Sequence, residues 1–509
     1  MGEGSTDGNL SPMELGGELS LYEIERVAYE GEKVAIGDKA MQRMAASRAI
    51  VEKIVAEGRT VYGVNTGFGG LSDVHIPPDQ LRELQVNLVR SHCCGLGNPL
   101  SEPEVRAMTL LRANVLALGF SGARPLVAEH LCSMLNAGVH ALVPEQGSVG
   151  ASGDLAPLAH LALCAMGEGE ATYDGTRMLA SDALAWADLQ PLTLEAKEGL
   201  SLLNGTQAMC AVGGLALARA VRLCDLADVA GVMTLEALLG TPVAFDERIH
   251  SVRGQPVQQL VARHLRSLME GSEIRESHVS GDSRVQDAYS LRCIPQVHGS
   301  VSMSVVRAAS VVQRETGAAT DNPLVFENGD ILSGGNFHGA YLAHAFDFAA
   351  IALTDLVSIS ERRLDRLITP EMSEGLPPFL TANPGTGSGF MIAHVAVVSL
   401  LNECKVLSHP ASVDNLPTSG GKEDHVSMGM TSALKLRKIV DNAERAIACE
   451  LMAAAEGLEY RKPLKPGPKL LAWYEKVRSV VPRLSTDRPL GADIERLAAE
   501  IRERRFSIE

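Results

Sequence analysis

Residues 206–239 read TQAMCAVGGLALARAVRLCDLADVAGVMTLEALL. Apolar residues recur in this stretch at three- and four-residue spacing, small residues are frequent and helix breakers are few, which predicts a long, closely packed helix. Similar stretches cover 299–318, 338–367, 388–408 and 425–459, and strand signals are few and short. We therefore expect a mainly α protein with a central bundle of long helices.

The sequence pattern divides the chain into four stretches. We expect a flexible polar tail over residues 1–14. Short helical patterns alternate with glycine-rich loops over residues 15–205. The long-helix stretches occupy 206–459. The last residues, 460–509, are richer in proline and charge and predict short peripheral helices. We expect 15–509 to form one structural unit.

The composition excludes several classes of protein. A net charge of −16 leaves no broad basic surface for a nucleic acid. No uncharged apolar run reaches the roughly eighteen residues that a membrane span needs, so we expect no membrane partner. Nine cysteines, an odd number without a Cys-x-x-Cys pair, suit reduced thiols in the cytoplasm. The histidines show no metal-binding spacing, and we expect no metal site.

The tripeptide Ala151-Ser152-Gly153 lies in a glycine-rich loop and has an unusual chemical capacity. Without a Cβ, the nitrogen of Gly153 can bend back onto the carbonyl carbon of Ala151. Ring closure with loss of two waters, one from Ser152, would leave a methylidene-imidazolone, an electrophile that no ordinary side chain provides. The motif is not a serine-hydrolase elbow, because Asp154 stands where Gly-x-Ser-x-Gly requires its last glycine.

Seven segments in order carry a family resemblance from about Leu15 to beyond residue 480. The chain resembles the aromatic amino acid ammonia-lyase and aminomutase family, and most closely its members that act on histidine. The segments are Tyr62-Gly63-Val64-Asn65-Thr66-Gly67-Phe68-Gly69, Gly150-Ala151-Ser152-Gly153-Asp154-Leu155-Ala156-Pro157, Leu203-Asn204-Gly205-Thr206-Gln207, Val285-Gln286-Asp287-Ala288-Tyr289-Ser290-Leu291-Arg292, Thr320-Asp321-Asn322-Pro323-Leu324, Gly334-Gly335-Asn336-Phe337-His338-Gly339 and Glu423-Asp424-His425-Val426-Ser427-Met428.

The resemblance implies the fold of histidine and phenylalanine ammonia-lyases. It also implies a 4-methylidene-imidazol-5-one prosthetic group made from Ala151-Ser152-Gly153, with no external cofactor. A homotetramer follows by the same resemblance, with D2 symmetry and each active site drawing residues from three chains. The broad apolar faces of the long helices are consistent with such an assembly.

Eliminating ammonia from an α-amino acid is difficult because the amine leaves poorly and the β-proton is not acidic. A built-in electrophile addresses the first difficulty. The resemblance implies that Tyr62 removes the β-proton and that Tyr289 assists ring formation or proton transfer. Asn204 is implied to hydrogen-bond the imidazolone oxygen, which would raise the electrophilicity of the ring.

The substrate carboxylate needs a fixed cation, and the planar fork of Arg292 could bind it with two hydrogen bonds. The resemblance gives this position that role. Gln286 is expected to help position the carboxylate. Phe337 is implied to pack beside the prosthetic ring, which is compatible with a place in the core.

His92 and Glu423 discriminate among amino acid substrates. An imidazole ring offers a donor and an acceptor, which a carboxylate and a histidine complement. Phenylalanine would leave both groups unpaired, and in family members that act on phenylalanine the matching positions are apolar and an amide. The expected reaction is therefore L-histidine to trans-urocanate and ammonia.

Two alternatives remain open. Family members that use tyrosine also carry a histidine at the position of His92, so a tyrosine ammonia-lyase or tyrosine 2,3-aminomutase with the same prosthetic group is the nearest rival. The more distant rival is an inactive helical scaffold that kept the fold and lost the activity.

Overall fold

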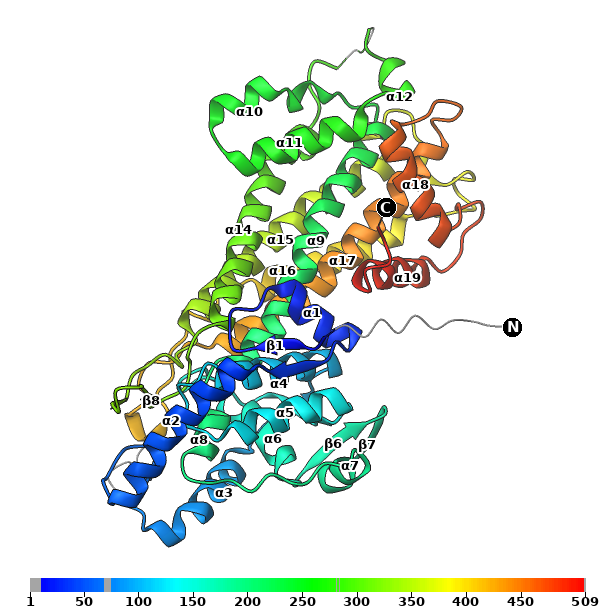
Figure 1. Cartoon of the computed structure of the whole chain (residues 1–509). Helices are drawn as coiled ribbons and strands as arrows, with labels where there is room; N and C mark the ends of the chain where they lie inside the picture. Colours follow the sequence, from blue (N-terminus) through cyan, green and yellow to red (C-terminus); the bar gives the residue numbers. More distant parts are fainter. Residues whose placement is uncertain (1–10, 68–74, 281, 283, 508–509) are drawn as a thin grey trace. The chain divides into compact units, whose positions relative to one another are not determined.

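The computed structural model describes residues 11–67, 75–280, 282 and 284–507. Long helices dominate these residues, and the prediction of a mainly α protein is confirmed (Figure 1). The chain forms two compact units that interleave along the sequence. The first unit comprises Met1–Ala218, Ala309–Phe346 and Ala411–Leu434, and the second comprises Arg219–Ala308, Asp347–Pro410 and Lys435–Glu509.

The five expected long helices are present, with ends within a few residues of those predicted. They are α9 (Gln207–Ala237), α14 (Ile294–Thr316), α15 (Ala340–Ile368), α16 (Met391–Leu407) and α17 (Gly429–Glu459). Small residues permit their close packing. A Cβ at Gly213 on α9 would lie 2.2 Å from a ring atom of Phe346 on α15, so only glycine fits there.

The first unit combines shorter helices with small sheets. Its helices are α1 (Leu21–Glu30), α2 (Asp38–Glu57), α3 (Leu81–His92), α4 (Glu102–Ala117), α5 (Pro125–Ala137), α6 (Leu155–Ala165), α7 (Ala180–Trp186) and α8 (Glu198–Leu203). Its strands are β1 (Met13–Leu15), β2 (Val34–Ile36), β3 (Leu96–Pro99), β4 (His140–Ala141), β5 (Pro144–Gln146), β6 (Glu170–Tyr173), β7 (Thr176–Leu179), β8 (Leu324–Val325) and β9 (Ile331–Leu332). Strand β1 pairs with β2 in parallel, and the pairs β3–β5 and β8–β9 and the three-stranded sheet β4–β6–β7 are antiparallel.

Local sequence signals explain where several of these helices begin and end. Ser20 and Glu23 form a capping box at the start of α1. Ser101 and Glu104 form a second one at the start of α4. Both boxes satisfy backbone N–H groups that a helix start leaves unpaired. Helix α5 ends at Gly138, whose φ of +81° favours glycine.

Helix α4 of the first unit is buried over most of its length. Its polar side chains bond to backbone groups of other segments. The Asn114 amide donates to the carbonyl oxygens of Gly17 and Thr316, both at 2.8 Å, and Arg106 donates to Val27 O. These bonds satisfy buried polar groups and fix the N-terminal segment on the helix.

The second unit contains segments of the long helices together with α10 (Glu247–Arg253), α11 (Pro256–Met269), α12 (Glu273–Glu276), α13 (Tyr289–Arg292), α18 (Pro468–Val480) and α19 (Leu490–Arg502). A buried ion pair crosses its interior. Arg363 donates to both carboxylate oxygens of Glu450 at 2.5 and 2.9 Å, and Ser360 also donates to Glu450. Complete pairing makes such a buried charge tolerable.

The expected divisions of the chain differ from these units. Order begins before residue 15, because Met13 and Glu14 belong to β1, while residues 1–10 lie outside the described residues. The expected limits at 205/206 and 459/460 do not coincide with unit limits, because the long helices continue from one unit into the other.

By length and composition, helix α15 could cross a membrane. Its most apolar window is 67% buried within the structure, as expected for the core helix of a folded protein. Among the described residues it is the one helix that meets the test. The helix carries Asp347 and Asp355, so it is not an uncharged apolar run, and the absence of a membrane partner stays a prediction.

Candidate active site

The loop that carries Ala151-Ser152-Gly153 is packed through its glycines. Gly150 and Gly153 have φ values of +71° and +76°. A Cβ at Gly150 would lie 2.1 Å from the Ser427 hydroxyl oxygen, and one at Gly153 would lie 2.0 Å from the carbonyl oxygen of Gly205. Only glycine fits either place, so the backbone of this loop is held from two sides.

Ser152 bonds to a predicted substrate-binding residue. Its hydroxyl donates to Glu423 Oε1 at 3.0 Å, and the Thr418 hydroxyl donates to Glu423 Oε2 at 2.7 Å. Both Ser152 and Glu423 are half-buried. The structure therefore brings together two residues that are 271 positions apart in the chain.

Asp154 ties the loop to the start of α9. Its side chain is fully buried and accepts from the Met209 backbone N–H and the Ser148 hydroxyl, each at 2.8 Å. Burial raises the pKa of Asp154 to about 6, although these hydrogen bonds favour the charged form. This residue is the one titratable group within the loop.

The Asn204-Gly205 peptide lies directly against Gly153. The Asp154 N–H donates to the Gly205 carbonyl at 2.7 Å, and Gly153 and Gly205 form an isolated parallel bridge. The Asn204 amide donates to Asn322 O at 3.2 Å, whereas its Oδ1 is buried without a hydrogen-bond partner. The amide nitrogen has a second hydrogen to donate, which suits a carbonyl oxygen of a group that forms beside Gly153.

Packing contacts draw other predicted motifs to the same part of the first unit. Gly63, next to Tyr62, has φ +73°, and a Cβ there would lie 2.8 Å from Pro323 Cδ. Asn322 Oδ1 in turn accepts from Gly334 N at 2.7 Å. Phe68 and Gly69 of the first motif lie outside the described residues. Tyr62 itself is half-buried.

The motif with Phe337 approaches the one with Glu423. The His338 ring stacks on His425 with centroids 5.8 Å apart and planes 2° apart, and Gly339 has no room for a Cβ against Met209. Phe337 is half-buried, as expected for a ring at the wall of a site. Six of the seven motifs thus belong to the first unit.

His92 lies at the last position of α3 and is half-buried. One ring nitrogen, Nδ1, is 2.8 Å from Leu88 O and 3.1 Å from the Ser91 hydroxyl. With Nδ1 bound to its own helix, Nε2 is the ring atom left for a ligand.

The remaining three predicted residues form a separate group in the second unit. The Arg292 guanidinium donates to Gln286 Oε1 at 2.6 Å and lies 4.5 Å from the centre of the Tyr289 ring. Tyr289 is 70% exposed. Stacking and hydrogen bonding set the direction of the guanidinium, while the tyrosine hydroxyl stays accessible.

Residues 151–153 fit the expected prosthetic group. A glycine with positive φ stands at the third position, the serine between is half-buried, and a peptide supports the glycine backbone. Beside the loop, the Asn204 amide has a second hydrogen that can be donated to the ring oxygen. In the part of the chain that the structure describes, no group of three or more histidine, cysteine or acidic side chains could hold a metal ion.

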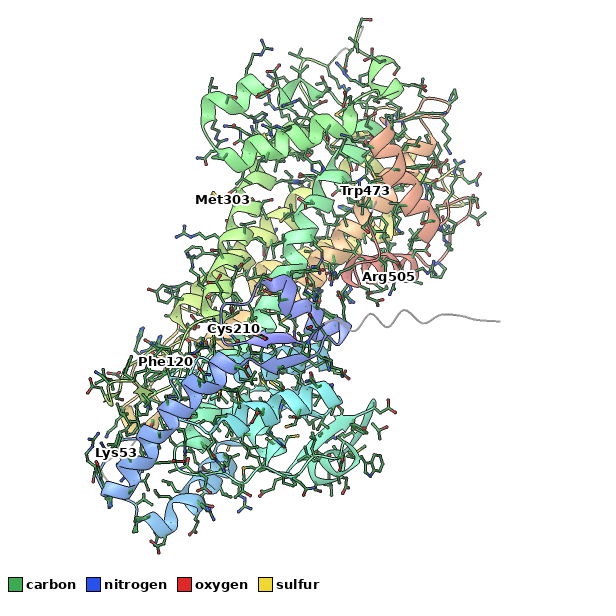
Figure 2. The ribbon with its side chains drawn as sticks, in the orientation of Figure 1. Lys53, Phe120, Cys210, Met303, Trp473 and Arg505 are labelled. Atoms are coloured by element: carbon green, nitrogen blue, oxygen red, sulfur yellow. The ribbon has the colours of Figure 1, made fainter. Side chains whose placement is uncertain are left out.

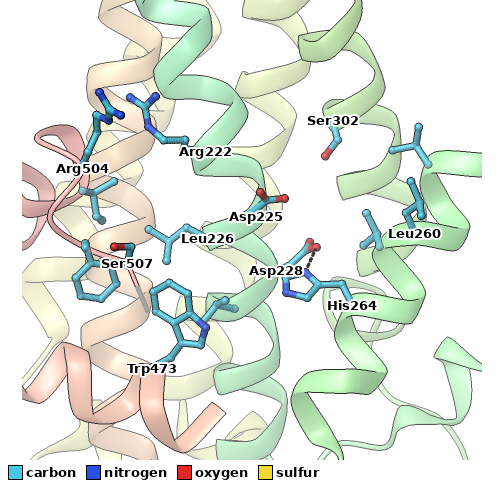
Figure 3. Close-up of a pocket in the computed structure, with 15 residues that line it drawn as sticks. Arg222, Asp225, Leu226, Asp228, Leu260, His264, Ser302, Trp473, Arg504 and Ser507 are labelled. Atoms are coloured by element: carbon cyan, nitrogen blue, oxygen red, sulfur yellow. Dashed lines mark hydrogen bonds and ion pairs between the residues drawn. The ribbon is translucent and has the colours of Figure 1, made fainter. Parts of the chain in front are cut away.

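A cavity of about 680 Å³ lies elsewhere, within the second unit (Figure 3). Its walls include Asp225, Asp228, His264 and Trp473, and His264 Nδ1 is 3.0 Å from Asp228 Oδ2. None of the predicted site residues lines it. This cavity is therefore not the candidate active site.

Sequence reasoning missed the residues that support the loop. Ser427, Gly205, Asn322 and Thr418 stand within or beside the recognised motifs but had no role assigned. Arg112 also supports the loop, because its Nη1 donates to the Asn204 carbonyl at 2.8 Å. It lies outside every motif, and its one sequence signal is a charged residue inside the apolar run Leu110-Leu111-Arg112-Ala113-Asn114-Val115-Leu116.

The chain is similar to known proteins over nearly its full length. A family model described as aromatic amino acid lyase matches residues 19–479. A histidine ammonia-lyase from Myxococcus xanthus is 54% identical over 481 residues, 94% of each chain. The crystal structure of histidine ammonia-lyase from Trypanosoma cruzi has a TM-score of 0.90 at 42% identity and covers 98% of this chain and 96% of that one. A tyrosine aminomutase from Streptomyces globisporus has a TM-score of 0.92 at 36% identity, covering 97% of each chain.

Proposed function

Because the chain belongs to the aromatic amino acid lyase family, we propose that it eliminates ammonia from L-histidine and releases trans-urocanate. The histidine ammonia-lyases that it resembles over nearly their full length support this substrate. The enzyme is a carbon–nitrogen lyase.

The observation that carries the choice of histidine is the position of Glu423. Its carboxylate lies 3.0 Å from the Ser152 hydroxyl, beside the residue from which the electrophile would form. A carboxylate there complements an imidazole N–H, whereas it would lose hydration without compensation beside a phenyl ring. His92 offers the second polar partner through Nε2.

A methylidene-imidazolone formed from Ala151, Ser152 and Gly153 supplies the electrophile that makes the amine a leaving group. Asn204 would hold the ring through its amide, whose second hydrogen is available beyond its bond to Asn322. Phe337 would pack against it. Hydrogen-bond donors held in place before the reaction stabilise charge that develops there.

The side chains of this protein carry out the binding and proton transfer. Arg292 binds the substrate carboxylate, with Gln286 setting the direction of its guanidinium at 2.6 Å. Tyr62 takes the β-proton from the substrate, and Tyr289 moves a proton at its exposed hydroxyl. Neither step needs an external cofactor.

We also propose a homotetramer whose active sites are shared among chains. Large apolar side chains are exposed in the second unit: Ile392 by 66% and Val395 by 56% on α16, Phe348 by 67% on α15 and Met303 by 48% on α14. Met303 is labelled in Figure 2. Exposed apolar surface of this extent favours burial against another copy of the chain. The nine free thiols suit a cytoplasmic location.

The test is incubation of the purified protein with L-histidine and, separately, L-tyrosine. We expect an increase in urocanate absorbance with histidine alone and an intact mass lower than that of the sequence by two water molecules. Coumarate or β-tyrosine without urocanate would show that the substrate is tyrosine. A mass equal to that of the unmodified sequence would show an inactive scaffold without the prosthetic ring.

A further inference from the structure

Arg112 lies at the centre of α4 with a fully buried side chain. One nitrogen, Nη1, donates to the Asn204 carbonyl at 2.8 Å, whereas Nε and Nη2 have no hydrogen-bond partner. Burial lowers the pKa of Arg112 to about 10, and Asp321 partly offsets the effect. An arginine with unpaired buried donors costs stability, so its presence calls for a role beyond packing.

Asp321 is already committed to another cation. Its Oδ2 accepts from Lys197 Nζ at 3.1 Å, and both side chains are fully buried. Its Oδ1 accepts from Asn322 N at 2.7 Å. The direct hydrogen bond of Arg112 is therefore to a backbone carbonyl and not to a carboxylate. Through this bond Arg112 fixes the Asn204-Gly205 peptide.

That peptide supports the loop of the prosthetic group. A Cβ at Gly205 would lie 3.0 Å from Arg112 Nη1, and one at Gly153 would lie 2.0 Å from Gly205 O. The Gly205 carbonyl accepts from Asp154 N at 2.7 Å. Arg112, Gly205 and Gly153 are thus stacked in contact, with no room for a side chain between them.

We propose that Arg112 is a positioning residue for ring formation: it holds the Asn204-Gly205 peptide as the support against which the Gly153 nitrogen meets the Ala151 carbonyl carbon. The inference rests on the proposed function. In this reaction the new bond joins those two atoms, and the Ala151 oxygen leaves as water with the protons of the Gly153 and Ser152 nitrogens. The Ser152 hydroxyl leaves with the Cα proton as the second water, so no oxidant or other reactant is needed.

The test compares Arg112→Met with Arg106→Met, a matched control on the same helix. Arg106 is also buried and also donates to a backbone carbonyl, that of Val27 at 2.8 Å, but does not touch the loop. Intact mass is measured on the folded fraction from size-exclusion chromatography, which removes misfolded protein from the readout. We expect Arg112→Met to slow ring closure by roughly tenfold to a hundredfold, so that most chains retain both waters, and Arg106→Met to be fully closed.

Arg112→Lys gives a second measurement with a smaller change. Its ammonium can reach the Asn204 carbonyl with one donor, so we expect a ring-closed fraction between those of the wild type and Arg112→Met. Complete ring closure in both Arg112 variants would overturn the role of Arg112. A ring-closed fraction in Arg106→Met as low as that in Arg112→Met would overturn it as well. A wild-type protein that keeps both waters would instead overturn the proposed function.

Discussion

Residues 147–154 and residues 284–292 hold their candidate catalytic groups in opposite ways. The first stretch is fixed through its backbone, with Gly153 pressed against a neighbouring peptide. The second is fixed through side chains: Arg284 lies 3.4 Å from carboxylates of both Asp287 and Glu374. Gln286 and Tyr289 are exposed, Tyr289 by 70%, and Arg292 is half-buried.

The difference follows from what each stretch must do. A ring that closes between backbone atoms needs those atoms in contact before reaction, which requires tight backbone packing. A stretch that receives a substrate needs accessible side chains on a backbone anchored elsewhere. Substitutions in the first stretch should therefore affect maturation and folding, and those in the second should affect substrate binding.

Ser152→Ala should have the largest effect. It removes the hydroxyl that leaves during ring closure, so the chain should keep its full mass apart from the substitution, and turnover of L-histidine should fall by at least about a thousandfold. Circular dichroism should show an unchanged helix content. Activity within tenfold of the wild type would show that Ala151-Ser152-Gly153 does not form the prosthetic group.

Gly153→Ala should be next. The added Cβ would meet Gly205 O at 2.0 Å in a residue with φ +76°, so we expect a loss of about 3–5 kcal/mol in the free energy of unfolding. Gly138→Ala is the matched control, because Gly138 has φ +81° and nothing within 4 Å of its Cβ position. It should cost only about 1 kcal/mol. Urea unfolding measures both, and equal losses would show that the contact with Gly205 is not tight.

Asp154→Asn tests the buried titratable group of the loop. Because the folded pKa of Asp154 is raised from 3.8 to about 6, the folded state binds more protons than the unfolded one between these values. Its contribution to stability is thus fully present below pH 4 and falls as the pH rises through about 6. Relative to the wild type, the variant should gain up to roughly 3 kcal/mol between pH 4 and pH 7. A pH-independent difference between the two unfolding free energies would contradict the raised pKa.

Arg292→Lys should have the smallest effect and separates the two stretches. The substitution keeps the charge but loses the planar fork, so kcat/KM for L-histidine should fall by about tenfold, chiefly through KM. The loss of two waters and the thermal stability should match the wild type, because the loop is untouched. A variant that retains both waters would show that the two stretches are not independent.

Helix positions and the residues of the recognised motifs could be predicted, because both depend on the local sequence. The helix expected over 206–239 is α9, Gln207–Ala237, because apolar periodicity and the absence of breakers are local properties. Order in the N-terminal tail was missed because β1 depends on pairing with Val34–Ile36, a distant segment. Ser152 and Glu423 were singled out separately, but their contact could not be inferred from spacing.

Supporting residues are the hardest to predict. Ser427 contacts Gly150 across 277 positions, and Arg112 contacts Asn204 across 92. Serine and arginine are common residue types, and their roles depend on which backbone they meet after folding. The sequence therefore identified the reacting groups by their chemistry and not the residues that hold them.

The contact between Gly153 and Gly205 also bears on how such a protein would change over generations. A side chain at position 153 is rejected by folding itself, before any catalysis is possible. The side chain at position 152 is half-buried and bonds to the Glu423 carboxylate, so a smaller side chain fits there. In a lineage that is no longer selected for activity, we expect Ser152 to be replaced first. Gly153 should be retained, because folding still requires it after the reaction is lost.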